Sequence, residues 1–149
     1  MKITKYILLF IILFNFNLYG GSEKLVEKMN YDVSYEKALQ KAIELNKPIM
    51  MVIGQEGCPW CNKFEVKTLL NKKISAKVQN SFVPLSIIRE LDSYPQRFRP
   101  KGVPTVLFID PKKENAFYKS FGYKSKREYK IELEKALELF NKIKDTNGS

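Results

Sequence analysis

The sequence predicts a single α/β domain, and three observations support this fold class. The chain has 149 residues, of which 44% are hydrophobic and 28% charged, a composition typical of one globular domain. Apolar segments of strand length alternate with segments in which apolar residues recur at helical spacing, in the order βαβ and then ββα. The chain contains no internal repeat and no low-complexity linker. We therefore expect residues 21–145 to form one domain, followed by a short polar tail, 146–149, that is disordered.

The first twenty residues have the pattern of a secretory signal peptide. Lys2 and Lys5 precede an uninterrupted apolar run, 6–14, and small residues follow at Gly20 and Gly21. The run is shorter than the roughly 20 apolar residues that a membrane-spanning helix needs. We therefore predict a signal peptide and a periplasmic or secreted mature chain, with an uncleaved membrane anchor as the alternative.

The first half of the mature chain is predicted to form a helix, a buried strand and a second helix. Apolar or small side chains recur at helical spacing after Ser34, a residue type that favours the helix N-cap, and Pro48 ends this helix. The run 49–53 is apolar at every position, as expected of a strand that is buried on both faces. We expect the next helix to begin at Cys58, with Pro59 in its first turn, where no amide hydrogen bond is lost.

The second half is predicted to contain two helices and three strands. In order, these are a helix over 72–79, a strand over 82–88, strands over 105–109 and 116–121, and a final helix after Ser125. Pro84 favours a position at the edge of the sheet for the first of these strands. The turn-forming residues 110–115 indicate that the other two strands form a hairpin. Ser125 and Glu128 have the spacing of a capping box at the start of the final helix.

The composition excludes several classes of protein. The chain has no His, so it has neither a Ser/His/Asp triad nor a metal site built on imidazole. Its two cysteines are too few for a disulfide scaffold, and it contains no nucleotide-binding glycine motif. The formal net charge is +10, but lysines are interleaved with glutamates instead of forming long basic runs. We therefore expect no metal, no organic cofactor and no nucleic-acid partner.

The tetrapeptide Cys58-Pro59-Trp60-Cys61 is the motif that carries chemistry. A C-x-x-C sequence at the start of a helix places the first sulfur against unpaired backbone amides and the positive end of the helix dipole, which lowers the thiol pKa. The second cysteine lies one turn inside the helix and can close a disulfide with the first, releasing a client from a mixed disulfide. We therefore assign Cys58 as nucleophile and Cys61 as resolving thiol.

Two other interpretations of the cysteine pair are possible. A purely structural disulfide would close a very small ring, which constrains the unfolded chain by only roughly 2 kcal/mol. A zinc site would need two further ligands, and the sequence offers neither His nor additional Cys. Both interpretations are weaker than a redox-active disulfide.

The order of these motifs resembles the thioredoxin superfamily, and more closely the secreted bacterial thioredoxin-related proteins with a C-P-W-C active site. The resemblance covers most of the mature chain. Its carriers are Ala38-Leu39 with Ala42, Lys47-Pro48, Cys58-Pro59-Trp60-Cys61, Phe82-Val83, Gly102-Val103-Pro104-Thr105 and Gly122-Tyr123. The resemblance implies a thioredoxin fold, with a central mixed β-sheet flanked by helices on both faces, and a redox disulfide between Cys58 and Cys61.

The resemblance also implies where a client chain binds. In the family the proline of a V-P-T triplet is cis and lies against the active-site disulfide, which implies a cis bond before Pro104. Val103, Pro104 and Thr105 would then form the substrate-binding segment, with the backbone of Val103 pairing with an extended client. Trp60 lies between the cysteines, where it is either a recognition surface for clients or part of the local packing.

One position departs from the family pattern. Ordinary thioredoxins place a buried Asp on the strand, six residues before the first cysteine, where it accepts the proton of the resolving thiol, and this chain has Val52 there. Glu56 is the only acid in the loop that leads to the motif, so we name it as the candidate proton acceptor for Cys61. The alternative for Glu56 is a solvated loop charge.

These observations predict a periplasmic thiol:disulfide oxidoreductase that acts more as a reductant than as an oxidant. The disulfide-donating oxidases of the family typically carry a His inside the C-x-x-C and a helical insertion, and this chain has neither. The resemblance implies cysteine-containing envelope proteins as substrates, a membrane thiol:disulfide electron donor and a monomeric state. The alternatives are a thioredoxin-like peptide-binding or chaperone module without redox turnover, and a disulfide-donating oxidase.

Overall fold

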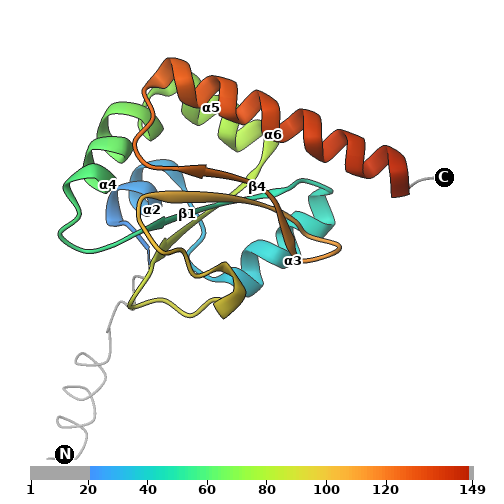
Figure 1. Ribbon diagram of the computed structural model, residues 1–149, viewed down its shortest axis with the longest axis horizontal. Coiled ribbons are helices and arrows are strands. Elements are labelled where there is room, and N and C mark those ends of the chain that lie inside the picture. The colour runs from blue at the N-terminus through green and yellow to red at the C-terminus, as the bar shows by residue number, and fades with distance from the viewer. Residues whose placement is uncertain (1–20, 148–149) are drawn as a thin grey trace, which may run out of the picture.

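The computed structural model describes residues 21–147, so the predicted signal peptide, residues 1–20, lies outside the described part of the chain. A four-stranded sheet forms the centre of the molecule, in the order β2-β1-β3-β4 (Figure 1). The strands are β1 (Ile49–Gly54), β2 (Val83–Ile88), β3 (Thr105–Asp110) and β4 (Asn115–Phe121). β2 is parallel to β1, whereas β3 is antiparallel to both β1 and β4. The predicted mixed sheet is confirmed.

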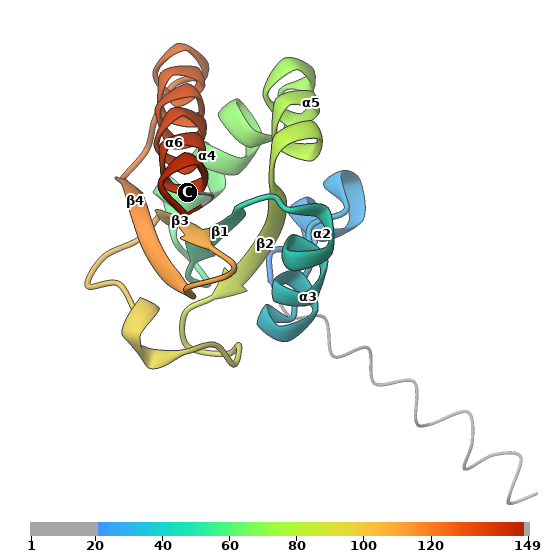
Figure 2. The same cartoon turned by 90° about the vertical axis from the view of Figure 1, so that its right-hand side faces the viewer.

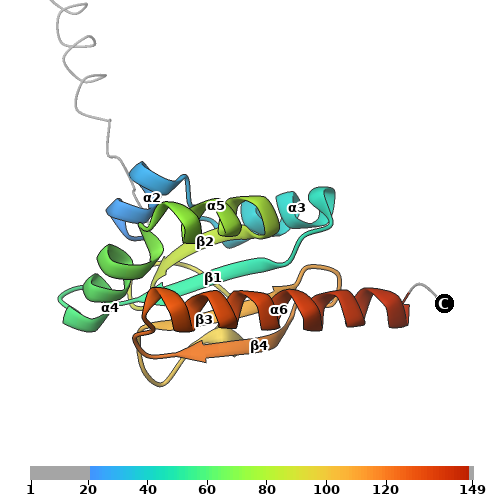
Figure 3. The same ribbon diagram turned by 90° about the horizontal axis from the view of Figure 1, so that it is seen from above.

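Helices cover both faces of this sheet, as expected. They are α2 (Glu23–Met29), α3 (Tyr35–Leu45), α4 (Pro59–Phe64), the π-helical turn η1 (Glu65–Leu69), α5 (Lys72–Ser81), the 3-10 turn η2 (Gln96–Phe98) and α6 (Lys126–Asn147). Buried residues of α4, η1, α5 and α6 form one core with one face of the sheet, and α3 and η2 contribute to a second core on the other face (Figure 2). Figure 3 shows α6 running nearly parallel to the strands.

The central strand β1 explains why the apolar run 49–53 has no polar position. Met50 and Val52 point into the core beneath α4, α5 and α6, whereas Ile49, Met51 and Ile53 point into the core beneath α3. Successive side chains of a strand alternate between faces, so a strand covered on both sides is apolar throughout. All six residues of β1 are buried.

Several predicted local features are confirmed. Ser34 caps α3 by accepting the Lys37 amide at 3.3 Å, and the Ser125 amide donates to the Glu128 carboxylate at 2.8 Å in the capping box of α6. β2, which contains Pro84, lies at the edge of the sheet. β3 and β4 form the expected antiparallel hairpin.

Two features differ from the sequence-based expectation. α6 extends to Asn147, so the first two residues of the predicted tail, 146–149, are helical. α2 was not predicted from the sequence, because only Leu25 of its seven residues is buried and so short a segment shows no apolar periodicity. None of the helices described between residues 21 and 147 is long and apolar enough to span a membrane.

The residues before α2 are held in place by two hydrogen bonds. The Gly21 amide donates to the Asp92 carboxylate at 2.8 Å, and the Ser22 amide donates to the Ser86 hydroxyl at 2.8 Å. Gly21 has a φ of 76°, and a Cβ at this position would lie 2.7 Å from the Ser86 carbonyl oxygen. Only glycine satisfies both requirements without strain. The result is a fixed position for Ser22 next to the helix that carries the cysteines.

Candidate active site

The cysteine motif lies in the loop that leaves the carboxyl end of β1 and at the first turn of α4. Cys58 has extended backbone geometry and is the N-cap of α4, and its Sγ accepts the Cys61 amide at 3.1 Å. Pro59 is the first residue of the helix, where no backbone donor is lost. The predicted placement of the first sulfur at a helix N-terminus is therefore confirmed.

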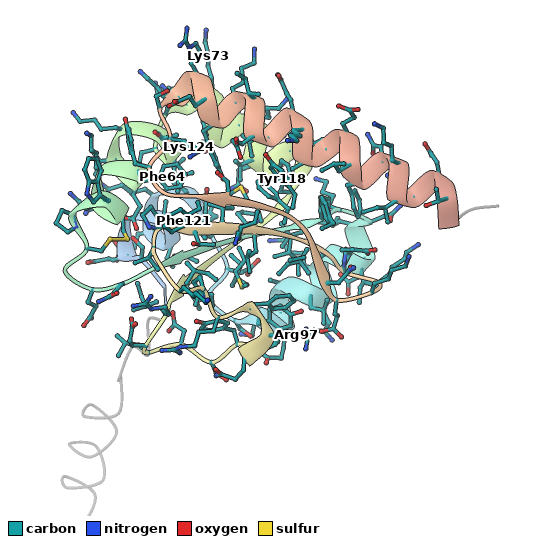
Figure 4. The ribbon with its side chains drawn as sticks, in the orientation of Figure 1. Phe64, Lys73, Arg97, Tyr118, Phe121 and Lys124 are labelled. Atoms are coloured by element: carbon teal, nitrogen blue, oxygen red, sulfur yellow. A yellow bond between two sulfur atoms is a disulfide. The ribbon has the colours of Figure 1, made fainter. Side chains whose placement is uncertain are left out.

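The two cysteines form a disulfide, with their Cα atoms 5.3 Å apart, and their environments differ (Figure 4). Cys61 is only 5% exposed and lies against Gly54 at the end of β1, whereas Cys58 is partly exposed. An incoming thiolate reaches the accessible sulfur more easily. In the reduced state, the Cys61 amide and the helix dipole would stabilise a thiolate on Cys58. This asymmetry supports Cys58 as the sulfur that exchanges with partners.

An apolar groove lies beside the motif, and we call it the aromatic groove. It has a volume of about 460 Å³ and is lined by Trp60, Val103, Pro104, Phe121, Gly122 and Tyr123. The Val103-Pro104 peptide bond is cis, as the resemblance implies. Thr105, which follows this bond, pairs with Ile53 of β1. The cis bond therefore lies at the same end of the sheet as the loop that carries the cysteines.

Trp60 is the most prominent side chain of the aromatic groove. It is 56% exposed, and its ring centroid lies 6.0 Å from that of Tyr123. The Lys63 ammonium lies 4.6 Å from the Trp60 ring centroid and 4.7 Å from that of Tyr123. These contacts cover part of the Trp60 side chain and leave more than half of it exposed.

Thr105 is not brought into the aromatic groove. Its side chain is buried, and its hydroxyl donates to the Gly102 carbonyl at 2.7 Å. This contact spans the turn that contains the cis bond. Of the predicted substrate-binding residues, Val103 and Pro104 therefore line the groove, and Thr105 supports the loop that contains them.

A second cavity, which we call the inner cavity, lies on the other side of the disulfide. It also has a volume of about 460 Å³, and both cysteines line it. Its remaining walls come from the loop and helix around the motif (Gln55, Glu56, Gly57, Pro59, Asn62 and Glu65), from the start of the domain (Gly21, Ser22, Glu23 and Lys24) and from Ile88. The inner cavity is therefore more polar than the aromatic groove.

Glu65 is the buried carboxylate of the inner cavity. It is only 8% exposed, and its Oε2 accepts the Ser22 hydroxyl at 2.7 Å. Burial raises the pKa of the Glu65 carboxyl, while the Ser22 hydrogen bond and the charge of Lys24 act in the opposite direction. The predicted acid, Glu56, also lines the cavity, but its side chain is exposed. Three carboxylates thus line the cavity, those of Glu23, Glu56 and Glu65, and the buried one, Glu65, was not predicted.

The sequence carried one signal for Glu65. The buried residues of this helical segment are Cys61, Phe64, Glu65, Thr68 and Leu69, which follow the spacing of one helix face. Glu65 is thus a charged residue inside an otherwise buried stripe, one turn after Cys61. Charged residues in this position are almost never fully buried without a partner. The partner, Ser22, comes from a segment whose position the sequence does not reveal.

Val52, which stands where ordinary thioredoxins have a buried Asp, lies in an apolar environment. Its side chain lies in the core with Phe64 and Tyr129, so β1 supplies no carboxylate beneath the disulfide. Among the described residues, no group of three or more His, Cys, Asp or Glu side chains is arranged to hold a metal ion.

Comparisons with known proteins agree with the geometry. A family model described as a thioredoxin-like domain matches residues 35–137. A thioredoxin from Thermus thermophilus superimposes with a TM-score of 0.61 and 25% identity, over 70% of this chain and 85% of that one. The DsbH oxidoreductase superimposes with a TM-score of 0.61 at 16% identity, over 83% of this chain and 94% of that one, and shows the same fold.

Among curated proteins, anterior gradient protein 3 of Mus musculus is 31% identical over 80 residues, which are 52% of this chain and 47% of that protein. The match thus spans about half the length of that relative. The family model covers more than half of the present chain, with the cysteine pair inside the matched region. This protein therefore belongs to the thioredoxin-like family.

Proposed function

We propose that this protein is a secreted or periplasmic thiol:disulfide oxidoreductase that exchanges its Cys58-Cys61 pair with cysteines of envelope proteins. The observation that carries the proposal is the position of the Cys58 sulfur. It caps the first turn of α4, accepts the Cys61 amide at 3.1 Å and is the more accessible of the two sulfurs. This arrangement suits a nucleophilic thiolate more than a structural crosslink.

The reaction then proceeds in two exchanges. In the reduced protein, the Cys58 thiolate attacks a client disulfide, forms a mixed disulfide and releases one client sulfur as a thiolate, which takes a proton from water. The Cys61 thiolate next attacks the Cys58 sulfur, which breaks its bond to the client and closes the Cys58-Cys61 disulfide. Two electrons pass from the protein dithiol to the client disulfide. A dithiol donor, proposed to be a membrane thiol:disulfide protein, returns the pair to the reduced state.

The aromatic groove supplies a place for the client chain. Trp60 and Tyr123 offer apolar surface next to the motif, and the groove also contains the backbone around Val103 and Pro104. An extended client that pairs with this backbone would place side chains against the rings. Aromatic side chains of this kind are frequent anchors of binding surfaces.

The direction of electron flow is proposed to be reduction of clients. The chain contains no His, so no imidazolium stabilises a Cys58 thiolate from inside the motif. A less stabilised thiolate corresponds to a less oxidising disulfide. The inner residues of the motif are Pro59 and Trp60, which add no positive charge.

The reduction potential of the Cys58-Cys61 pair tests the direction. The domain would be equilibrated with glutathione or dithiothreitol buffers, and the oxidised fraction measured by trapping free thiols. A value near about −270 mV, typical of thioredoxin, is expected. A value near about −120 mV would identify a disulfide donor and contradict the proposed direction.

A further inference from the structure

We propose that Glu65 accepts the proton of the Cys61 thiol during resolution of the mixed disulfide, and that Ser22 positions the Glu65 carboxylate for this task. The inference rests on the proposed function, because it assigns a residue to the second of its two exchanges. It replaces the candidate named from the sequence, Glu56, with a residue that the sequence analysis did not name.

The position of Glu65 brings its side chain to the same side of the helix as Cys61. The two residues are four positions apart, so they occupy one face of the helical segment. Both are buried, and both line the inner cavity. The cavity volume of about 460 Å³ is many times the space that one water molecule needs. A water in the cavity can therefore carry a proton from the Cys61 sulfur to the Glu65 carboxylate.

The widened turn η1 begins at Glu65. The Leu70 amide donates to the Glu65 carbonyl at 2.9 Å, a bond between residues five apart instead of four. Such π-helical turns are uncommon and occur frequently at functional sites. In this chain the turn lies directly after the helix that carries the active-site cysteines.

Burial makes the Glu65 carboxylate a stronger proton acceptor than an exposed glutamate. A group that takes a proton in one step and releases it afterwards works best when its pKa is near the working pH. Burial raises the pKa of Glu65 above its ordinary value, toward that range. The hydrogen bond from the Ser22 hydroxyl stabilises the ionised form and limits the rise.

The other titratable groups around Glu65 do not replace it. Those that line the inner cavity or act electrostatically on Glu65 are Glu23 and Lys24 of α2, Tyr31, Glu56 and the two cysteines. The phenol of Tyr31 is fully buried, and burial together with the charge of Glu65 raises its pKa, so it remains neutral. Glu23, Lys24 and Glu56 are exposed and solvated. Glu65 is thus the buried acid of this cavity wall within residues 21–147.

The Ser22 hydroxyl is held by the fold. Its own amide is bound to Ser86, and the Gly21 amide is bound to Asp92. The hydroxyl therefore approaches Glu65 from a segment that is tied to the edge strand. A side chain fixed in this way keeps the carboxylate in one orientation relative to the cavity.

Cys61 carries a proton in the mixed disulfide, and Glu65 is ionised. The proton passes from the Cys61 sulfur through water to the Glu65 carboxylate, while the Cys61 sulfur attacks the Cys58 sulfur and the client leaves as a thiolate. Glu65 then returns its proton through the cavity to solvent. When the oxidised protein is reduced, the same groups act in reverse, and Glu65 protonates the departing Cys61 thiolate.

The test is a comparison of Glu65→Gln with Glu56→Gln, a matched change at the exposed acid of the same cavity. A mixed disulfide between Cys58 and a small thiol would be formed during rapid mixing, and its resolution by Cys61 would be followed between about pH 5 and pH 9. Resolution in Glu65→Gln is expected to be roughly a hundredfold slower near neutral pH, the lower end of a general-base contribution. The difference is expected to vanish at alkaline pH, where Cys61 ionises without help. Glu56→Gln is expected to match the parent protein within about twofold.

A second readout separates proton transfer from a purely electrostatic effect. The pKa of Cys61 would be measured in a Cys58→Ser background from the ultraviolet absorbance of the thiolate. Removing the negative charge of Glu65 favours the Cys61 thiolate, so Glu65→Gln is expected to lower the pKa of Cys61 while it slows resolution. If resolution becomes faster together with the lower pKa, Glu65 acts only as a nearby charge and the proposal is wrong.

Ser22→Ala tests the positioning role. Loss of the hydroxyl removes a bond that stabilises ionised Glu65, so the pKa of the carboxyl rises and the acidic limb of the resolution profile moves to higher pH. The rate is expected to fall at about pH 6 and to match the parent protein at about pH 8. A profile that does not move would remove Ser22 from the proposal.

The first exchange provides the control for the proposed function itself. Attack of the Cys58 thiolate on a small aromatic disulfide does not involve the Cys61 proton, so this exchange is measured separately in the parent protein. A parent protein that fails in this first exchange would contradict the proposed function. A parent protein that performs both exchanges, with Glu65→Gln equal to it at every pH, would contradict only the role of Glu65.

Discussion

The aromatic groove and the inner cavity lie next to the same cysteine motif and have similar volumes, but they differ in the polarity and burial of the side chains that line them. The groove is apolar, and Trp60 and Phe121 are exposed on its surface, whereas the cavity is polar and contains the buried Glu65. One region offers surface to a partner of variable sequence, and the other offers a fixed environment for a proton. The comparison predicts that the proposed client binding and the proposed sulfur chemistry can be changed independently, so each has its own test.

The largest expected effect comes from the cysteines themselves. Cys58→Ser is expected to abolish reduction of insulin disulfides, because no thiolate remains at the helix N-terminus. Cys61→Ser is expected to accumulate a covalent complex between Cys58 and the client, since the resolving thiol is missing. Turbidity of reduced insulin and mass spectrometry of the trapped complex measure the two outcomes.

The same variants distinguish an enzyme from a binding module. A thioredoxin-like module without redox turnover would not reduce insulin, and its affinity for peptides would be the same in Cys58→Ser as in the parent protein. If Cys58→Ser retained measurable insulin reduction, the assignment of the nucleophile would be wrong. The peptide affinity of Cys58→Ser, measured by calorimetry, shows in addition whether the aromatic groove binds without covalent exchange.

The next effect isolates the aromatic groove. Trp60→Ala removes an exposed ring from the groove without touching Glu65, so it is expected to raise KM for protein clients about tenfold and to leave kcat nearly unchanged. Ile131→Ala, which removes an exposed apolar side chain from α6, is the matched control and is expected to change neither constant. Steady-state kinetics with a client protein and with a small disulfide complete the comparison.

The small disulfide decides how the Trp60 result is interpreted. It occupies no groove, so its exchange rate is expected to be the same in Trp60→Ala and the parent protein. A loss of rate with this substrate would show that Trp60 acts on the cysteines and not on client binding. Such a result would contradict the prediction that the aromatic groove can be changed without affecting the reaction of the cysteines.

A smaller effect tests the wall of the inner cavity. Gly21→Ala introduces a Cβ that would lie 2.7 Å from the Ser86 carbonyl oxygen, in a residue with a φ of 76°. Gly57 also has a positive φ, of 68°, but a Cβ there would meet nothing within 4 Å. Gly57→Ala is therefore expected to cost about 1 kcal/mol of unfolding free energy from backbone strain alone, and Gly21→Ala roughly 1–2 kcal/mol more.

Urea unfolding of the two alanine variants measures this difference. Equal losses of stability would mean that the close approach of Gly21 to Ser86 is relieved by a small shift of the chain. Gly21→Ala also moves the backbone next to Ser22. We therefore expect its resolution profile to resemble that of Ser22→Ala, while the profile of Gly57→Ala is expected to stay closer to the parent protein.

The contrast between the two regions also explains what the sequence could and could not predict. The strands, the helix that begins after Cys58 and the capping box of α6 follow from local patterns, and the structure contains each of them. The cis bond before Pro104 followed from the family resemblance. These features depend on residues that are close in sequence or on a motif that is recognisable by itself.

The inner cavity was not predictable for a physical reason. Glu65 is buried because Ser22, 43 residues earlier, is held against the edge strand and donates to it. Neither contact produces a periodic pattern in the sequence. The helix α2, which begins directly after Ser22, buries only one residue. Glu56 was the reasonable choice from the sequence because it is nearest to the motif, yet proximity along the chain does not determine burial. The side chain of Thr105 illustrates the same point, because it turns toward Gly102 and away from the groove.

The smallest expected effect comes from a residue that lines neither the aromatic groove nor the inner cavity, so it serves as a control for both. Ser125→Ala removes one half of the capping box of α6, which is expected to lower the unfolding free energy by about 1 kcal/mol. Because no residue of this box lines either the aromatic groove or the inner cavity, the exchange rates and their pH profile are expected to remain unchanged. If this variant slowed resolution of the mixed disulfide, a loss of global stability would be sufficient to slow it, and a slow Glu65→Gln would no longer identify a proton acceptor. The profiles of Ser125→Ala and Glu65→Gln are therefore measured at the same temperature. If the profile of Ser125→Ala is unchanged, the slower resolution in Glu65→Gln results from the Cys61 proton and not from a loss of fold stability.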